Sequence, residues 1–104
     1  MDDLRLLIDR IRALLDGRSA DPGGVPTEVE NTLTDGYALA LALEGECLRI
    51  GRRMAELTRT VDRPEEAEEL RSLAGKLIAT EEELSKLRTL LAELRRRHPS
   101  PSAV

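Results

Sequence analysis

The stretch TVDRPEEAEE, residues 60–69, decides the fold because it interrupts an otherwise continuous helical pattern. Proline fits the first turn of an α-helix, but it disrupts a helix interior. One helix is therefore predicted to end at Val61 and the next to begin at Pro64, with Asp62 or Arg63 as the capping residue. The glutamates after Pro64 then fall in the first turns of the new helix, where the helix dipole favours negative charge.

Apolar residues on both sides of this break recur in alternating steps of three and four residues. That spacing is typical of helices that pair along one apolar stripe, and we call these positions the seam. The strand-like run ALALAL, residues 38–43, falls inside this helical period, and alanine is the strongest helix former. Helices are therefore predicted over 27–61, where Thr27 and Glu30 match a capping box, and over 64–97. The seam consists of Val29, Leu33, Gly36, Ala40, Leu43, Cys47, Ile50, Met54, Leu57 and Val61, and of Leu70, Leu73, Leu77, Thr80, Leu84, Leu87, Leu91 and Leu94.

A short amphipathic helix is predicted over residues 2–16, with Gly17 as its stop. Residues 17–26, GRSADPGGVP, are predicted to be a linker, because two prolines and three glycines in this stretch oppose regular structure. We expect a single helical domain over 1–98 and a disordered tail over 99–104. The apolar residues of the short helix are Leu4, Leu7, Ile8, Ile11, Leu14 and Leu15.

Two long helices joined by a tight turn are expected to run antiparallel. Pairing them about the turn places Arg53 beside Glu69 and Glu46 beside Lys76. Both contacts join opposite charges, although nothing in the seam requires this agreement. The fold class that we predict is all-α: a coiled-coil-like antiparallel hairpin with a short N-terminal helix.

The other flank of the hairpin is expected to contact a third layer. Leu41, Leu48 and Ile78 lie just outside the seam there, and a helix with so wide an apolar arc packs against more than one neighbour. The N-terminal helix is one candidate, but its roughly 22 Å would cover less than half of a hairpin about 50 Å long. We therefore expect the three-helix unit to dimerise into a larger bundle, with a monomeric three-helix bundle as the alternative. The predicted interface residues are Leu7, Ile11, Leu14, Leu41, Leu48 and Ile78.

The overall composition disfavours several classes of protein. The 104 residues have a formal net charge of −4, which disfavours a nucleic-acid-binding protein, and the single cysteine excludes an intramolecular disulfide. No apolar run approaches the roughly 20 residues that a membrane span needs. The N-terminus MDDLRLLID lacks the basic start of a secretory signal, so a cytoplasmic location is predicted. Most basic residues are arginine, which suits a GC-rich bacterial genome.

No residue pattern predicts a catalytic, metal or cofactor site. Glu44 and Glu81 are expected opposite each other, where two carboxylates could bind a metal, share a proton, contact an arginine of the N-terminal helix or reach solvent. A metal site in a helical bundle normally adds further glutamates and a Glu-x-x-His pattern, which the sequence lacks. Cys47 has no histidine near it in this register, and His98 follows arginines at a helix end. We therefore predict no cofactor, no metal and no small-molecule substrate.

The motif LRxxIDxI, residues 4–11, resembles the opening of the all-helical chorismate mutases, which are small dimers of three helices. That family places an acidic residue where Arg12 stands, and it continues one long helix where GRSADPGG interrupts this chain. The resemblance implies an enzyme in which Arg5 or Arg12 binds a dicarboxylate within a helical bundle.

The leading hypothesis from the sequence is a non-enzymatic helical interaction protein, acting as a scaffold or regulatory adaptor. Its partner would be a second copy of the chain, forming a homodimer, or the helices of another protein. Burial of leucine-rich surfaces would hold the complex together, and flanking charges would set its register. The alternative hypothesis is a small helical-bundle enzyme of the chorismate-mutase type with an arginine-lined dicarboxylate pocket.

Overall fold

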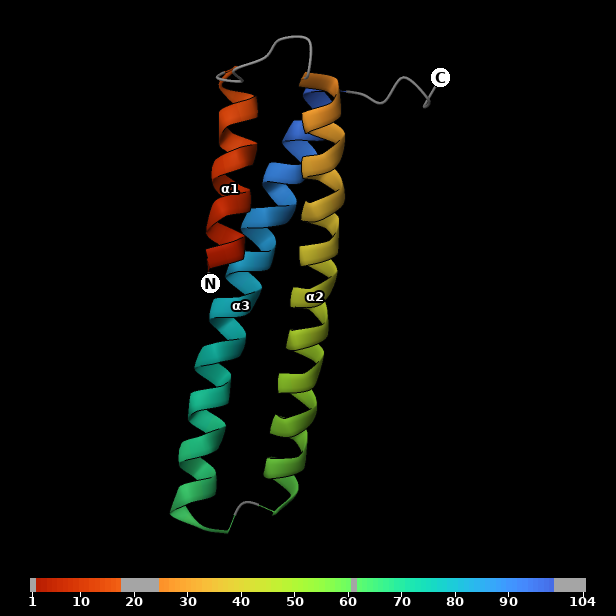
Figure 1. Cartoon of the computed structure of the whole chain (residues 1–104). Coiled ribbons are helices and arrows are strands. Elements are labelled where there is room, and N and C mark those ends of the chain that lie inside the picture. Colours follow the sequence, from red (N-terminus) through yellow and green to blue (C-terminus); the bar gives the residue numbers. More distant parts are fainter. Residues whose placement is uncertain (1, 18–24, 61, 99–104) are drawn as a thin grey trace. The chain divides into compact units, whose positions relative to one another are not determined.

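A computed structural model describes residues 2–17, 25–60 and 62–98, and their regular secondary structure is entirely α-helical. The helices are α1 (Asp2–Leu15), α2 (Val25–Thr60) and α3 (Pro64–Arg97), as drawn in Figure 1. The all-helical class predicted from the sequence is thus confirmed. Most of the predicted linker and the whole predicted tail lie outside the described residues.

Two helix ends follow the local signals in the sequence. Pro64 is the first residue of α3, and the Arg63 carbonyl oxygen accepts hydrogen bonds from the backbone N–H groups of Glu66 and Ala67, at 3.1 and 3.2 Å. Arg63 is therefore the capping residue. Gly17 ends α1 with a φ of 70°, a left-handed conformation that glycine adopts without strain.

The start of α2 differs from the prediction. The helix begins at Val25, two residues before the expected start at Thr27. Pro26 stands in the first turn, where a missing N–H removes no intrahelical hydrogen bond, so the proline does not delay the start of the helix. Thr27 lies inside the first turn and cannot act as the N-terminal cap, so the predicted capping box is wrong.

The contacts of the chain divide it into two compact units. Unit 1 comprises Met1–Ala40 and Lys86–Val104, and therefore contains α1, the first part of α2 and the last part of α3. Unit 2 is Leu41–Ser85, the remaining parts of α2 and α3 with the turn between them. The long helices α2 and α3 each contribute to both units, and a single domain over 1–98 stays a prediction.

Unit 1 has a closed core because three helices contribute to it. Ile11 of α1 and Leu87 and Leu94 of α3 are 0% exposed, and Leu91 is 1% exposed. Val29 of α2 completes this core at 2% exposure. Burial of a side chain of this size contributes about 1.5–3 kcal/mol, so α1 is held mainly by its apolar face.

Unit 2 has a more open core because only two helical segments form it. The α2 seam residues Leu43, Ile50 and Leu57 are buried at 2–4% exposure. Opposite them, three leucines of the α3 seam are only half-buried: Leu70, Leu73 and Leu77. On α3, the seam leucines of unit 1 are thus fully buried, whereas three of the four in unit 2 are partly exposed; the fourth, Leu84, is buried at 7% exposure.

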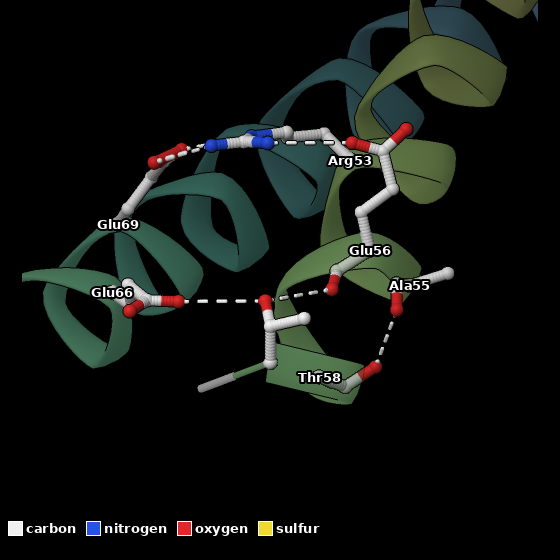
Figure 2. Close-up of polar contacts among 7 residues, drawn as sticks. Arg53, Ala55, Glu56, Thr58, Glu66 and Glu69 are labelled. Atoms are coloured by element: carbon white, nitrogen blue, oxygen red, sulfur yellow. Dashed lines mark hydrogen bonds and ion pairs between the residues drawn. The ribbon is translucent and has the colours of Figure 1, made fainter. Parts of the chain in front are cut away.

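Two ion pairs fix how the helical segments of unit 2 lie beside each other. Arg53 Nε lies 3.0 Å from Glu69 Oε2, and Lys76 Nζ lies 3.2 Å from Glu46 Oε1. Figure 2 shows the Arg53 guanidinium between Glu69 of α3 and Glu56 of α2. These are the two charge pairs predicted from the sequence, and both are confirmed. Exposed pairs each contribute only about 0–1 kcal/mol, so they report the register more than they stabilise it.

Candidate interaction surface

Three large aliphatic side chains of unit 2 are exposed to solvent. Leu41 is 69% exposed, Leu48 is 62% exposed and Ile78 is 58% exposed. Single exposed leucines are common on protein surfaces, but grouped ones mark sites of interaction. Their significance therefore depends on whether they share one side of the unit.

Helical geometry places these three residues on one side of unit 2. Leu48 follows Glu46 by two residues and Ile78 follows Lys76 by two, which turns each side chain roughly 200° away from the ion-paired flank. Leu41 stands two full turns before Leu48 and so shares its side of α2. We call the surface formed by Leu41, Leu48 and Ile78 the aliphatic face.

The residues around the aliphatic face are small. A Cβ atom added to Gly51 or Gly75 would meet open space, and Ala55 is exposed. Ala74 is half-buried. Short side chains here leave room for another helix to approach closely, because backbone-to-backbone distance in helix packing depends on side-chain size.

The predicted interface residues of the first helix lie elsewhere. Leu7, Ile11 and Leu14 are 4%, 0% and 8% exposed, since they pack into the core of unit 1. They make contacts within their own chain. The part of the predicted interface that lies at the surface is the aliphatic face.

The contacts of α1 are on a side of α2 that the sequence analysis did not indicate. Arg10 Nη1 lies 2.9 Å from Asp35 Oδ2, and Arg10 Nη2 donates a hydrogen bond of 3.2 Å to Thr32 Oγ1. Residues seven apart lie on the same side of a helix, and Thr32 forms one such series with Leu39, Glu46 and Arg53. Leu41 and Leu48 of the aliphatic face belong to a different series. Within unit 1, α1 therefore packs on a different side of α2 from the flank for which it was a candidate.

The type of residue in this seven-residue series changes between the two units, which explains where α1 packs. In unit 2 it is occupied by Glu46 and Arg53, which form ion pairs at the surface. In unit 1 it is occupied by Thr32, 2% exposed, and the half-buried Leu39, which offer α1 an uncharged surface. An apolar helix packs against the uncharged positions because burying unpaired charge is costly.

A cavity of about 440 Å³ opens between α1 and α2 within unit 1. Its volume lies in the range of small-molecule sites. Its charged residues are Asp3, Arg10 and Asp35, and the Arg10 guanidinium is already bound to Asp35 and Thr32. Its apolar lining is Leu6, Leu7, Ala38 and Leu39. Two carboxylates and one engaged arginine favour a cation over a dicarboxylate.

The arginines that the sequence singled out do not line this cavity. Arg5 and Arg12 are exposed on α1, whereas Arg10, which does line it, was not predicted. Its contact with Asp35 joins residues 25 positions apart on different helices, and no local spacing signals such a pair. The same is true of Arg97, whose Nη1 donates a 3.0 Å hydrogen bond to the Leu15 carbonyl oxygen at the end of α1.

Cys47 is half-buried in the seam of unit 2. Burial raises the pKa of its thiol above the ordinary value, and the nearby carboxylates of Glu81 and Glu46 raise it further. The thiolate, which is the nucleophilic form, is therefore disfavoured. The influence of Glu81 also places this residue of α3 close to the Cys47 position of α2.

The remaining candidate residues show no assembled chemistry. Among the described residues, no group of three or more His, Cys, Asp or Glu side chains is arranged to hold a metal ion. Glu81 is exposed and Glu44 is half-buried. The His98 backbone N–H donates a 3.0 Å hydrogen bond to the Leu94 carbonyl oxygen, in keeping with a place at the end of α3.

The helices themselves and comparisons with known proteins both bear on the class of protein. No helix within residues 2–17, 25–60 and 62–98 has the length and apolar character needed to cross a membrane. Comparisons of the chain with models of protein families, with curated proteins and with solved structures found no match. The aliphatic face is therefore the feature from which a function can be inferred.

Proposed function

We propose that this chain is a non-enzymatic helical interaction protein that acts through its aliphatic face. The observation that supports this most directly is the contrast between the two cores. The α3 seam leucines of unit 1 are 0–1% exposed, whereas in unit 2 Leu84 is buried at 7% exposure but the other three are half-buried. Leu41, Leu48 and Ile78 of unit 2 are also exposed. A further layer on unit 2 would remove this apolar surface from water.

The occupant that we propose for the aliphatic face is a second copy of this chain. Closed two-fold dimers are the commonest soluble assemblies, and such an interface uses the same surface of both copies. Each fully buried leucine or isoleucine contributes about 1.5–3 kcal/mol, part of which offsets the entropy lost on association. Docking onto a helix of another protein would use the same residues.

The proposal extends to the architecture of the assembly. In it, α2 and α3 form one antiparallel hairpin along their whole length, with α1 as a third helix against part of it. Two such hairpins form a larger helical bundle. A cytoplasmic and bacterial setting, with a scaffolding or regulatory role, belongs to this proposal.

Sedimentation velocity of two matched variants tests the proposed surface. Leu48→Glu adds a charge to the aliphatic face and is expected to shift the chain to a monomer, because the charge would be buried without a partner. Ala42→Glu adds the same charge at an exposed position of the same helix and is expected to sediment like the wild type. If the wild type is monomeric, or if both variants remain dimeric, self-association through this face is excluded.

The enzyme alternative makes a different prediction. An arginine-lined dicarboxylate pocket would raise the melting temperature in the presence of small dicarboxylates. The cavity near Arg10 contains Asp3 and Asp35 as well, so we expect no shift. A shift that is lost in an Arg10→Met variant would favour the enzyme over the interaction protein.

A further inference from the structure

We infer that two copies pair through a two-fold axis perpendicular to the helices, which brings Leu48 onto the partner's Leu48 and Ile78 onto the partner's Ile78. Arg52 of each copy then lies against the partner's Glu44. This inference rests on the proposed function and specifies the geometry of the interface.

The position of the axis follows from the register of unit 2. The contact between Glu46 and Lys76 sets these two residues beside each other, and Leu48 and Ile78 each stand two residues further along. Because the two helical segments run antiparallel, these steps lead in opposite directions, and this contact alone would set Leu48 level with Ala74. The approach of Glu81 to Cys47 would instead set Leu48 level with Thr80, so the two contacts bracket Ile78. A single two-fold axis that runs across both helices at this height, in the plane of the interface, places both residues at the centre of the interface.

The charges on α2 match this axis. When α2 meets its own copy antiparallel about Leu48, residues equally distant from Leu48 face each other. Four residues before it is Glu44 and four residues after it is Arg52, so the interface contains two pairs of opposite charge. Arg52 is exposed, and Glu44 has an interaction within its own chain, to which the partner's arginine would add a second.

The sizes of the facing residues also match. Three residues before Leu48 is Gly45 and three residues after it is Gly51. The space beside Gly51 is open, whereas the Arg49 guanidinium lies 3.5 Å from a Cβ atom added to Gly45, so a close approach of the two backbones requires the Arg49 side chain to move. Leu41 faces the partner's Ala55, which pairs a large side chain with a small one. Interdigitation of large and small side chains is how helices pack without voids.

The facing residues on α3 create no repulsion. About Ile78, Gly75 faces the partner's Glu81, Ala74 faces the partner's Glu82, and Arg71 faces the partner's Ser85. Each charged residue meets a small or polar one, and no two residues of like charge face each other.

The alternative two-fold axis, parallel to the helices, brings like charges together. It would place α2 against the partner's α3 at equal height, and hence Glu44 against the partner's Glu81. Besides burial, Glu81 and Glu46 raise the pKa of the Cys47 thiol, so carboxylates already lie near this part of the unit. Like charges in contact across an interface are costly, so the perpendicular axis is favoured.

The area of the face suits a dimer that dissociates on dilution. Each helical segment of unit 2 is about 30 Å long, and two packed helices are about 20 Å wide, which gives about 600 Å² per copy. Standard stable interfaces bury about 800 Å² per partner. The equilibrium should therefore be measurable in ordinary concentration ranges.

Charge reversal in the full-length chain tests the pairing. Arg52→Glu and Glu44→Arg alone should each raise the dissociation constant of the dimer about tenfold or more, because each change affects two symmetric contacts. The double variant should restore the constant to within about threefold of the wild type. Arg59→Glu, with the same change of charge at an exposed position away from these pairs, is the control and should leave the constant unchanged.

Disulfide trapping tests the axis independently of charge. In a Cys47→Ala background, Leu48→Cys should form a covalent dimer on mild oxidation, because a residue beside the axis meets its own copy. Ser72→Cys in the same background should form none. The two readouts separate the claims: a wild-type dimer with neither charge rescue nor trapping overturns this axis and leaves the proposed function standing. A wild type that is monomeric at all concentrations overturns both.

Discussion

Glu46 and Glu69 show how single side chains record the pairing of the two helices. Hydrogen bonds from Arg49 and Lys76 lower the pKa of Glu46, and the hydrogen bonds from Arg53 lower the pKa of Glu69. Both glutamate side chains are partly exposed, at 30% and 40%, so their individual contributions to stability are small. They should nevertheless make the stability of the fold depend on pH in a way that can be assigned to these two residues.

Stability is predicted to fall when these carboxylates are protonated. Their pKa values are lower in the folded chain than the ordinary value of 4.5, so the stabilisation is present above that value and is lost as pH falls through the folded pKa. Urea denaturation of the wild type and of Glu69→Gln, between about pH 6 and pH 3, measures this. The variant should lose less stability over that interval, and an identical loss would show that the Arg53 contact does not stabilise the fold.

Cys47 is predicted to react slowly with alkylating reagents. Its raised pKa leaves less thiolate near pH 8 than an ordinary cysteine has, and its half-buried position limits access. The rate of iodoacetamide alkylation against pH should show a midpoint above that of a cysteine in an unfolded peptide. A midpoint at or below the peptide value would contradict the burial of this thiol in the seam.

At the scale of the helix, the packing of α2 against α3 depends on which glycines have space. A Cβ atom added to Gly36 would overlap the side chain of Leu91, which is 1% exposed and has little room to move. A Cβ atom added to Gly75 would meet nothing. The same substitution at the two sites should therefore have opposite effects.

Gly36→Ala is predicted to destabilise the chain by about 1 kcal/mol, because overpacking costs more than the gain in helix propensity. Gly75→Ala is predicted to stabilise it by about 0.5–1 kcal/mol, through helix propensity alone. Thermal unfolding by circular dichroism measures both changes. If Gly36→Ala were as stable as Gly75→Ala, the close approach of α2 and α3 at Leu91 would be incorrect.

The positions of the helices could be predicted from the sequence better than the contacts between them. Pro64 and the seam are local signals, so the start of α3 and the ion pairs of Arg53 and Lys76 were predicted correctly. The side of α2 that α1 contacts was not predicted, because it depends on a contact between Arg10 and Thr32, which stand 22 positions apart on different helices. Local patterns specify elements, whereas contacts between elements depend on residues from several of them.

At the scale of the whole molecule, the candidate site could be predicted only in part. The aliphatic face was found from the sequence because Leu41, Leu48 and Ile78 widen the apolar arc beyond the seam. Leu7, Ile11 and Leu14 were assigned to the same interface, since nothing in one amphipathic helix distinguishes an internal contact from an external one. Their burial at 0–8% in unit 1 makes that distinction.

The uneven burial of the seam is the property that points to an assembly. A chain whose two units were equally closed would need no partner, whereas unit 2 exposes three large aliphatic side chains beside half-buried leucines and unit 1 exposes one, Leu6. A short α1 explains the difference, because fourteen residues of helix supply a third layer to one unit only. Self-association is the proposed means of supplying that layer to the other.

The molar mass of the full chain in solution, measured by light scattering over a wide range of concentration, tests this claim most directly. If the chain self-associates, its mass should approach twice 11.5 kDa at high concentration and fall towards 11.5 kDa on dilution. A mass of 11.5 kDa at every concentration would contradict it.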